Sequence, residues 1–230
     1  MQTKPIDVKI YCIPGLGLNA QIFNKLHLDG CDVSFIEWIE PNRGESISNY
    51  AERISQELRG LNSEVILIGH SFGGVLAQEI SSYIKVKLII LISSIKSPQE
   101  IPFSFKLLST FRLYKLVSRP IILFTFPLWA HINGYVSKKL RLIFKESIKS
   151  LSSYYLRWSL KEISNWEGIS NIAAPIVQIH GNSDLTFPIK LIFNPSNIIK
   201  KGDHLMVCRM ASEIKLIIEE EIKALKKEKR

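Results

Sequence analysis

The 230-residue sequence is poor in cysteine and has no apolar run long enough to cross a membrane. Its three cysteines, Cys12, Cys31 and Cys208, have neither Cys-x-x-Cys spacing nor histidines at ligand spacing, which argues against a disulfide framework or a zinc site. The N-terminus has no apolar segment typical of a secretory signal. The longest apolar run, 121–130, has about half the length that a transmembrane helix needs, and it contains Pro127. We therefore expect a soluble, cytoplasmic protein without a transmembrane segment.

Acidic residues are also fewer than basic ones, 21 against 30, so the chain carries a formal charge of +9. The lysines are scattered, however, and their densest cluster is the C-terminal tail from Lys223 to Arg230. Cations at the end of a helix are explained by the helix dipole and by solvation. No pattern of a known nucleic-acid-binding motif accompanies them. We therefore expect no nucleic-acid partner, while the charge favours anionic substrates and leaves contact with a membrane surface open.

The chain contains enough hydrophobic residues, 46%, for one large core. Short aliphatic runs alternate with helical patterns, which predicts an α/β fold with a mostly parallel open sheet of about six strands and helices on both faces. The expected strands are Val8–Ile13, Val33–Ile39, Val65–Ile68, Val86–Ile92, Ile176–Ile179 and Asn197–Ile199. The expected helices between and after them are Ala20–Leu26, Ser46–Leu58, Val75–Tyr83 and Ala211–Lys227.

The rhythm of strands and helices breaks between residues 97 and 166. This stretch has no clear strand and holds 13 of the chain's 22 aromatic residues. We expect an inserted helical cap at 97–166 over the carboxyl edge of the sheet, and a core formed by 1–96 and 167–230. Most of its aromatic side chains are expected to form the core of the cap, and some to line an apolar pocket. The helical patterns within it are Lys106–Val117, Ser137–Lys149 and Leu151–Ser164, with breaks at Arg119-Pro120 and Asn133-Gly134.

The most informative motif is Gly69-His70-Ser71-Phe72-Gly73-Gly74, which has the spacing Gly-x-Ser-x-Gly. It lies between a buried-strand pattern and a helical pattern, the context in which this spacing presents a serine on a sharp turn. The flanking glycines allow neighbouring backbones to approach, and the following helix adds partial positive charge. The motif predicts Ser71 as a nucleophile, although glycine-rich turns between strand and helix are also common without catalysis.

A serine nucleophile needs a base, and that base needs a carboxylate to orient it. Among five histidines, His204 alone falls late in the chain on a loop at the carboxyl edge. Asp184 follows the strand Ile176–Ile179 at the same edge, and is the predicted carboxylate. Asp203 and Glu100 are weaker alternatives. The less favourably placed histidines are His27, His70, His131 and His180.

Acyl transfer through a serine also needs two N–H donors for the oxyanion of the tetrahedral intermediate. The backbone N–H of Phe72, directly after the nucleophile, is the first candidate. The second is the N–H of Leu16, in the glycine-containing loop Pro14-Gly15-Leu16-Gly17 after the first strand. A plain glycine-rich turn would explain this loop equally well.

With these motifs the sequence resembles the α/β-hydrolase fold superfamily, in particular compact esterase-like members with a helical cap. The resemblance extends from Val8 to about Val207 and rests on the Ser71 motif, His180-Gly181-Asn182-Ser183-Asp184 and Gly202-Asp203-His204. The order Ser71, Asp184, His204 is the one expected for this fold. Two features depart from it: Pro14-Gly15 replaces the usual His-Gly, and the leading strands of the full eight-stranded sheet are missing.

The resulting hypothesis is a serine hydrolase that cleaves a carboxylic ester or thioester, with a hydrophobic small-molecule substrate, through an acyl-enzyme. It implies no metal and no organic cofactor. An acyltransferase or a lyase could use the same site, and a non-catalytic ligand-binding protein of this fold is a further alternative, because a fold alone does not determine a function.

Overall fold

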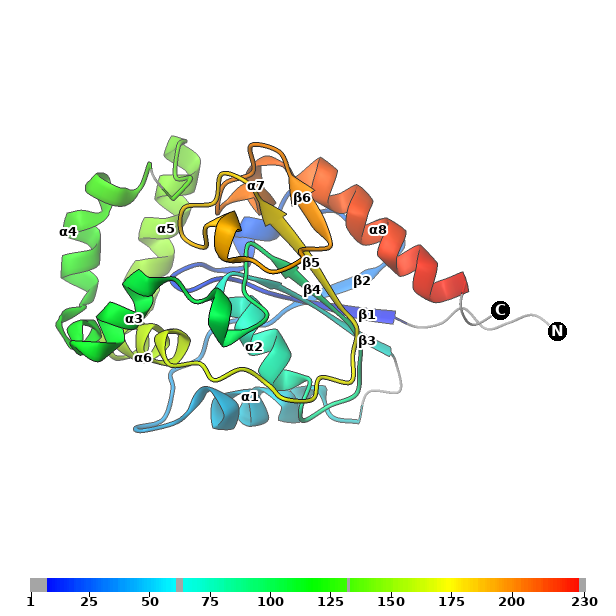
Figure 1. Cartoon of the computed structure of the whole chain (residues 1–230), viewed down its shortest axis with the longest axis horizontal. Helices are drawn as coiled ribbons and strands as arrows, with labels where there is room; N and C mark the ends of the chain where they lie inside the picture. The colour runs from blue at the N-terminus through cyan, green and yellow to red at the C-terminus, as the bar shows by residue number, and fades with distance from the viewer. Residues whose placement is uncertain (1–7, 61–63, 132, 228–230) are drawn as a thin grey trace.

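The computed structural model describes residues 8–60, 64–131 and 133–227, and its centre is a six-stranded sheet. The strand order is β2-β1-β3-β4-β5-β6, and all neighbouring strands are parallel. The open parallel sheet predicted from the sequence is therefore confirmed (Figure 1). The strands are β1 Val8–Ile13, β2 Asp32–Phe35, β3 Glu64–His70, β4 Val86–Ile92, β5 Ile176–Gly181 and β6 Asn197–Ile199.

Helices cover both faces of this sheet. In Figure 1, α1 and α2 lie below the strands, and α8 lies above them. The described residues form the α-helices α1 Ile47–Ser55, α2 Phe72–Ile80, α3 Phe103–Thr110, α4 Arg119–Trp129, α5 Lys138–Ser150, α6 Ser153–Ser164, α7 Met206–Arg209 and α8 Ala211–Lys227. The 3-10 helices are η1 Ala20–Phe23, η2 Gln56–Leu58, η3 Pro98–Glu100, η4 Leu113–Leu116 and η5 Ile189–Leu191.

The central strands β3 and β4 consist mostly of consecutive apolar residues, as expected where both faces of a strand are covered. Six of the seven residues of β4, all except Lys87, are buried, as are the six residues of β3 from Val65 to His70. Local signals also act as expected: the side chain of Ser46 accepts the N–H of Asn49 and caps α1. These buried strands place their carboxyl ends at one edge of the sheet.

Strand β2 is shorter than the predicted Val33–Ile39, since it pairs with β1 only through Phe35. Ile36 still donates its N–H to the carbonyl of Cys12 on β1, and the chain then leaves the sheet. Trp38 donates its indole N–H to the carbonyl of Gly15 at 3.1 Å, and the N–H of Ile39 donates to the hydroxyl of Tyr50. The predicted helix Ala20–Leu26 is likewise only the short 3-10 helix η1.

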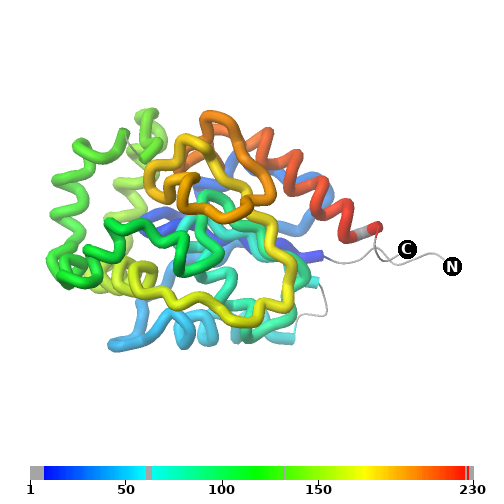
Figure 2. Tube along the Cα trace, viewed as in Figure 1, coloured from blue at the N-terminus to red at the C-terminus, as the bar shows by residue number. Residues whose placement is uncertain are grey.

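The chain between β4 and β5 contains helices and no strand among its described residues, and α3 to α6 lie beyond the carboxyl ends of the strands (Figures 1 and 2). After α6 the chain returns along the sheet to the start of β5. The predicted helix Lys106–Val117 is divided, because Arg112 has the positive φ of 54° and separates α3 from η4. Helix α4 was not predicted; Arg119-Pro120, read as a break, is its first turn. Proline is tolerated there because the N–H that it lacks has no partner within a helix.

A search of the described residues for membrane-spanning segments finds no helix that combines sufficient length with sufficient apolarity.

Candidate active site

Ser71 lies on the sharp turn between β3 and α2 in a strained backbone conformation, with φ 52° and ψ −123°. Non-glycine residues rarely adopt a positive φ, and they keep it only where the surroundings enforce it. Here the Ser71 N–H donates to the carbonyl of Ile92 at 3.0 Å. The Ser71 carbonyl accepts the N–H of Gly74 at 2.9 Å and the hydroxyl of Ser94 at 2.6 Å. These bonds hold the serine at the end of the strand.

Two glycines of the motif allow the close contacts that this turn requires. A Cβ at Gly69 would collide with the backbone of Gly74. A Cβ at Gly73 would collide with the carbonyl oxygens of Ile13 and Pro14. The start of α2 therefore packs directly against the loop after β1, which brings that loop beside Ser71.

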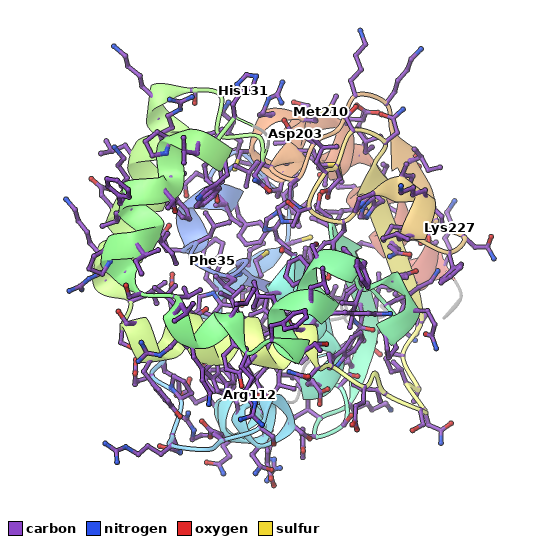
Figure 3. The ribbon with its side chains drawn as sticks, turned by 60° about the vertical axis from the view of Figure 1, so that its left-hand side comes forward. Phe35, Arg112, His131, Asp203, Met210 and Lys227 are labelled. Carbon is purple, nitrogen blue, oxygen red and sulfur yellow. The ribbon has the colours of Figure 1, made fainter. Side chains whose placement is uncertain are left out.

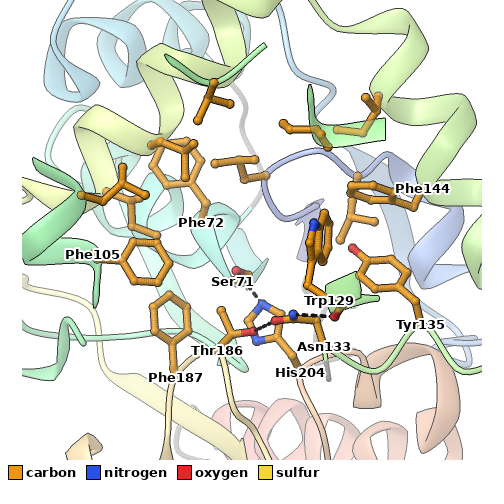
Figure 4. A pocket seen from close by; sticks show the side chains of 18 residues that line it. Ser71, Phe72, Phe105, Trp129, Asn133, Tyr135, Phe144, Thr186, Phe187 and His204 are labelled. Carbon is orange, nitrogen blue, oxygen red and sulfur yellow. Dashed lines mark hydrogen bonds between the residues drawn. The ribbon is translucent and has the colours of Figure 1, made fainter. Parts of the chain in front are cut away.

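The structure brings Ser71, His204 and Asp184 into one hydrogen-bonded chain. Nε2 of His204 lies 2.9 Å from Oγ of Ser71, and Nδ1 of His204 lies 2.9 Å from Oδ2 of Asp184. Figure 4 marks the bond between Ser71 and His204 with a dashed line. The three residues follow β3, β6 and β5, whose carboxyl ends share one edge of the sheet. All three are buried or nearly so. With Asp184 ionised, Nδ1–H donates to the carboxylate and Nε2 is left to accept the serine O–H.

The carboxylate of Asp184 is held by the turn that follows it. Its Oδ1 accepts the N–H groups of Thr186 at 2.8 Å and Phe187 at 2.9 Å. Burial alone would raise the pKa of Asp184, but the imidazoles of His204 and His180 and the N–H of Phe187 together hold that pKa below its usual range. Asp184 is therefore ionised at neutral pH.

The two weaker alternatives for the carboxylate make other contacts. Asp203 pairs with Arg209 and accepts the N–H of Leu205. Glu100 is buried away from His204 and accepts the N–H groups of Lys96 and Phe193. Among the described residues, Asp184 is the only one whose carboxylate lies at hydrogen-bond distance from the His204 ring.

His70 supports the site in a way that the sequence reasoning missed. Its Nε2–H donates to the backbone carbonyl of His204 at 2.8 Å, so it holds the loop that carries the imidazole. Burial, reinforced by the nearby His204, lowers the pKa of His70 from 6.5 to about 3. His70 is therefore neutral. Its place beside Ser71 was visible in the sequence, but the direction of its side chain was not.

The low pKa of His70 predicts that stability falls in acid. The unfolded chain protonates this residue below about pH 6.5, but the folded chain does so only near about pH 3. The free energy of unfolding should therefore fall by about 1.4 kcal/mol per pH unit between these values from this group. Urea unfolding across this range measures the slope, with His70→Gln as the comparison because it keeps an N–H donor and removes the titration. Equal slopes for both proteins would contradict the assignment.

Leu16 and Phe72 both line the cavity beside Ser71 and His204. No partner for the backbone N–H of either residue is found within the described ranges. Trp38 contacts both parts of the chain that carry these N–H groups. Its indole N–H donates to the carbonyl of Gly15, and its ring stacks on Phe72 with ring centroids 5.2 Å apart. The role of Trp38 had no sequence signal, because it depends on where the chain turns after β2.

Ser71 and His204 open into a cavity of about 380 Å³ with mostly apolar walls. Helices α3 to α6 and the loops between them supply much of the wall, including Phe105, Trp129 and Phe144 (Figure 4). Polar groups are few. The hydroxyl of Thr186 donates to the side-chain oxygen of Asn133 at 2.5 Å, a pair that the sequence reasoning did not identify. A cavity with apolar walls and a few convergent polar groups is typical of a small-molecule site.

Within the part of the chain that the structure describes, no group of three or more His, Cys, Asp or Glu side chains is arranged to hold a metal ion.

No protein-family model and no curated protein sequence matches the chain. Solved structures do match it. MenH from S. aureus has a TM-score of 0.73 at 15% identity, over 98% of this chain and 96% of its own. YbtT, a type II thioesterase from the yersiniabactin NRPS/PKS pathway, has a TM-score of 0.65 at 16% identity, over 97% and 96%. A thermophilic esterase from Thermogutta terrifontis has 0.66 at 15% identity, over 95% and 90%. The chain therefore has the α/β-hydrolase fold.

Proposed function

We propose that the protein is a serine hydrolase that cleaves a carboxylic ester or thioester of a hydrophobic acyl group through an acyl-enzyme. The observation that carries this proposal is the chain Ser71–His204–Asp184, with both bonds at 2.9 Å, at the wall of an apolar cavity. Serine, histidine and a buried carboxylate in this relation activate a hydroxyl as a nucleophile. The esterase and the thioesterase that share the fold support the reaction class.

In the proposed reaction, Oγ of Ser71 attacks the carbonyl carbon while its proton passes to Nε2 of His204. The tetrahedral intermediate collapses, the bond to the leaving oxygen or sulfur breaks, and His204 returns the proton to that atom. Water then attacks the acyl-enzyme, His204 takes its proton, and Ser71 regains it as the carboxylic acid leaves. Asp184 remains ionised throughout, keeps the imidazole in the required tautomer and stabilises the imidazolium.

We assign the backbone N–H groups of Leu16 and Phe72 as the hydrogen-bond donors to the developing oxyanion. Both residues border the cavity next to Ser71, and Phe72 is the first residue of α2, where the helix N-terminus adds positive potential. Such donors stabilise the transition state by about 3 kcal/mol each. For the domain division, we propose that 1–96 and 167–230 form the catalytic core and that 97–166 form a cap that shapes the acyl-binding walls.

Turnover of p-nitrophenyl esters of increasing acyl length, together with an acyl thioester, tests this function. We expect hydrolysis with a preference for longer acyl chains over acetate, because the cavity is mostly apolar. Labelling of Ser71 by a fluorophosphonate without ester turnover would instead indicate an acyltransferase or a lyase. Tight binding of a hydrophobic molecule with neither acylation nor turnover would indicate a ligand-binding protein.

Gly15→Ala is expected to slow the reaction without preventing folding. The added Cβ would lie 2.8 Å from Nδ1 of His70 and 3.1 Å from Cβ of Ser71, so the loop that carries Leu16 has to shift. A displaced oxyanion donor should lower kcat by about 100-fold and change KM little. The kinetics of p-nitrophenyl ester hydrolysis measure both values.

Gly30→Ala is the matched control. Unlike Gly15, Gly30 has a positive φ, of 68°, so an alanine there is strained, but nothing lies within 4 Å of the added Cβ. It should lower the melting temperature and leave kcat unchanged. If the Gly15→Ala enzyme had a normal kcat, the proposal that the loop after β1 supplies an oxyanion donor would be wrong.

A further inference from the structure

Helix α4 is apolar on all sides, and its inner side belongs to the cavity. Ile122 and Trp129 line the cavity wall, and Phe126 is buried. From Pro120 to its last residue the helix contains no charged side chain. A helix on a protein surface ordinarily presents polar residues to water. The proposed reaction explains the inner side of α4 but not the outer side.

The outer side of α4 exposes large hydrophobic side chains. Phe124 is 85% exposed and Leu128 is 79% exposed, and Ile121 is exposed as well. These residues recur at intervals of three and four, so they share one face of the helix, which we call the outer apolar face. In Figures 1 and 2, α4 is the outermost element at its end of the molecule, and no other described element covers this face.

The segment around the outer apolar face is strongly basic. Residues 97–166 contain eleven lysines and arginines and three glutamates, a formal +8 out of the chain's +9. Glu100 and Glu162 are buried, so Glu146 is the only exposed carboxylate among the described residues of this segment. Exposed bases occur on η4, at the start of α4, and on α5, which packs against α4: Arg112, Lys115, Arg119, Lys138, Lys145 and Lys149. Figure 3 turns this end of the molecule forward, with Arg112 on it and Lys227 on the far right.

We propose that the outer apolar face docks on an anionic lipid surface, with Phe124 and Leu128 inserted among the acyl chains and the surrounding bases at the headgroups. Exposed apolar side chains combined with lysine and arginine are what binds a segment in the plane of such a surface. Because α4 is the outermost element at its end of the molecule, its outer face is accessible to an extended surface such as a bilayer. A second copy of the same face would bring two strongly basic segments against each other, which opposes a symmetric dimer.

This docking does not depend on the proposed reaction, because it concerns the opposite side of α4. It does add a consequence for the cavity. Since Ile122 and Trp129 on the inner side line the cavity, docking places the acyl-binding walls within one helix diameter of the lipid.

Sedimentation with vesicles tests the proposal on the full chain. Vesicles of equimolar phosphatidylglycerol and phosphatidylcholine should bind the protein at least about tenfold more tightly than phosphatidylcholine alone, and added salt should weaken the binding. The double variant Phe124→Asp, Leu128→Asp should lose at least about tenfold in binding to the anionic vesicles. Leu216→Asp is the matched control: Leu216 is 62% exposed on α8, at the other end of the molecule, and binding should be unchanged.

Thermal melting establishes that each variant is folded, and Phe124→Gln is a milder second variant that should weaken binding in the same direction. Absence of binding to anionic vesicles at low salt, or equal binding by the double variant, would overturn the proposal. A dimer that the double variant lacks, without vesicle binding, would assign the face to a second copy. Retention on polyglutamate without vesicle binding would assign it to an acidic protein. Ester turnover, measured separately, reports on the proposed function alone.

Discussion

Ser71→Ala is expected to lower kcat/KM for ester hydrolysis by about 10⁴-fold or more, the largest effect of any single change in this chain. The substitution removes the only atom that forms the covalent bond in the proposed reaction. Its structural cost is small: the backbone bonds to Ile92, Gly74 and Ser94 all remain. Steady-state kinetics with p-nitrophenyl esters measure the loss, and thermal melting should show a protein as stable as the wild type.

Ser82→Ala is a suitable control for this experiment. Ser82 is exposed after the end of α2 and its hydroxyl has no hydrogen-bond partner within the described residues. Its removal should leave kcat/KM unchanged. If Ser71→Ala retained more than about a tenth of the wild-type kcat/KM, another group would have to be the nucleophile and the proposed mechanism would be wrong.

Asp184→Asn is expected to lower kcat by about 10⁴-fold while leaving the fold intact. The amide oxygen of asparagine can still accept the N–H groups of Thr186 and Phe187, so the turn after β5 keeps its bonds. Its NH₂ group, however, donates toward Nδ1 of His204, which forces the proton onto Nε2. In that tautomer the imidazole cannot accept the proton of Ser71. Pre-steady-state kinetics of ester cleavage should show slow acylation.

Asp203→Asn provides the matched comparison, since Asp203 adjoins His204 in sequence but pairs with Arg209. It should retain nearly full activity and lose a little stability. The opposite result, an active Asp184→Asn and an inactive Asp203→Asn, would transfer the orienting role to Asp203. Full activity in both variants would leave Glu100 as the remaining candidate for the carboxylate that orients His204.

The sheet and the placement of the polar residues could be predicted because local sequence determines them. In runs such as Val86–Ile92 all residues except Lys87 are apolar, with no regular alternation, and this is typical of parallel strands covered on both faces. Parallel strands end at one edge, so residues after β3, β5 and β6 can be expected to lie near one another. The prediction could state that Ser71, Asp184 and His204 share an edge, but it could not give the two distances of 2.9 Å.

The remainder depends on contacts between distant parts of the chain. Trp38 looked like part of a strand, but its indole N–H bonds to Gly15 and draws the chain away from the sheet. Arg119-Pro120 looked like a break, although proline in a first turn can begin a helix, as it does in α4. The bond from His70 to the carbonyl of His204 spans 134 residues, and no local pattern encodes it.

The most direct measurement is active-site labelling with a fluorophosphonate, followed by peptide mapping of the intact chain by mass spectrometry. If His204 activates Ser71, one adduct should form per molecule, on Ser71, and a folded His204→Ala variant should react at least about 100-fold more slowly. An adduct on a different residue, or equally fast labelling of Ser71 without the imidazole, would contradict the proposed activation.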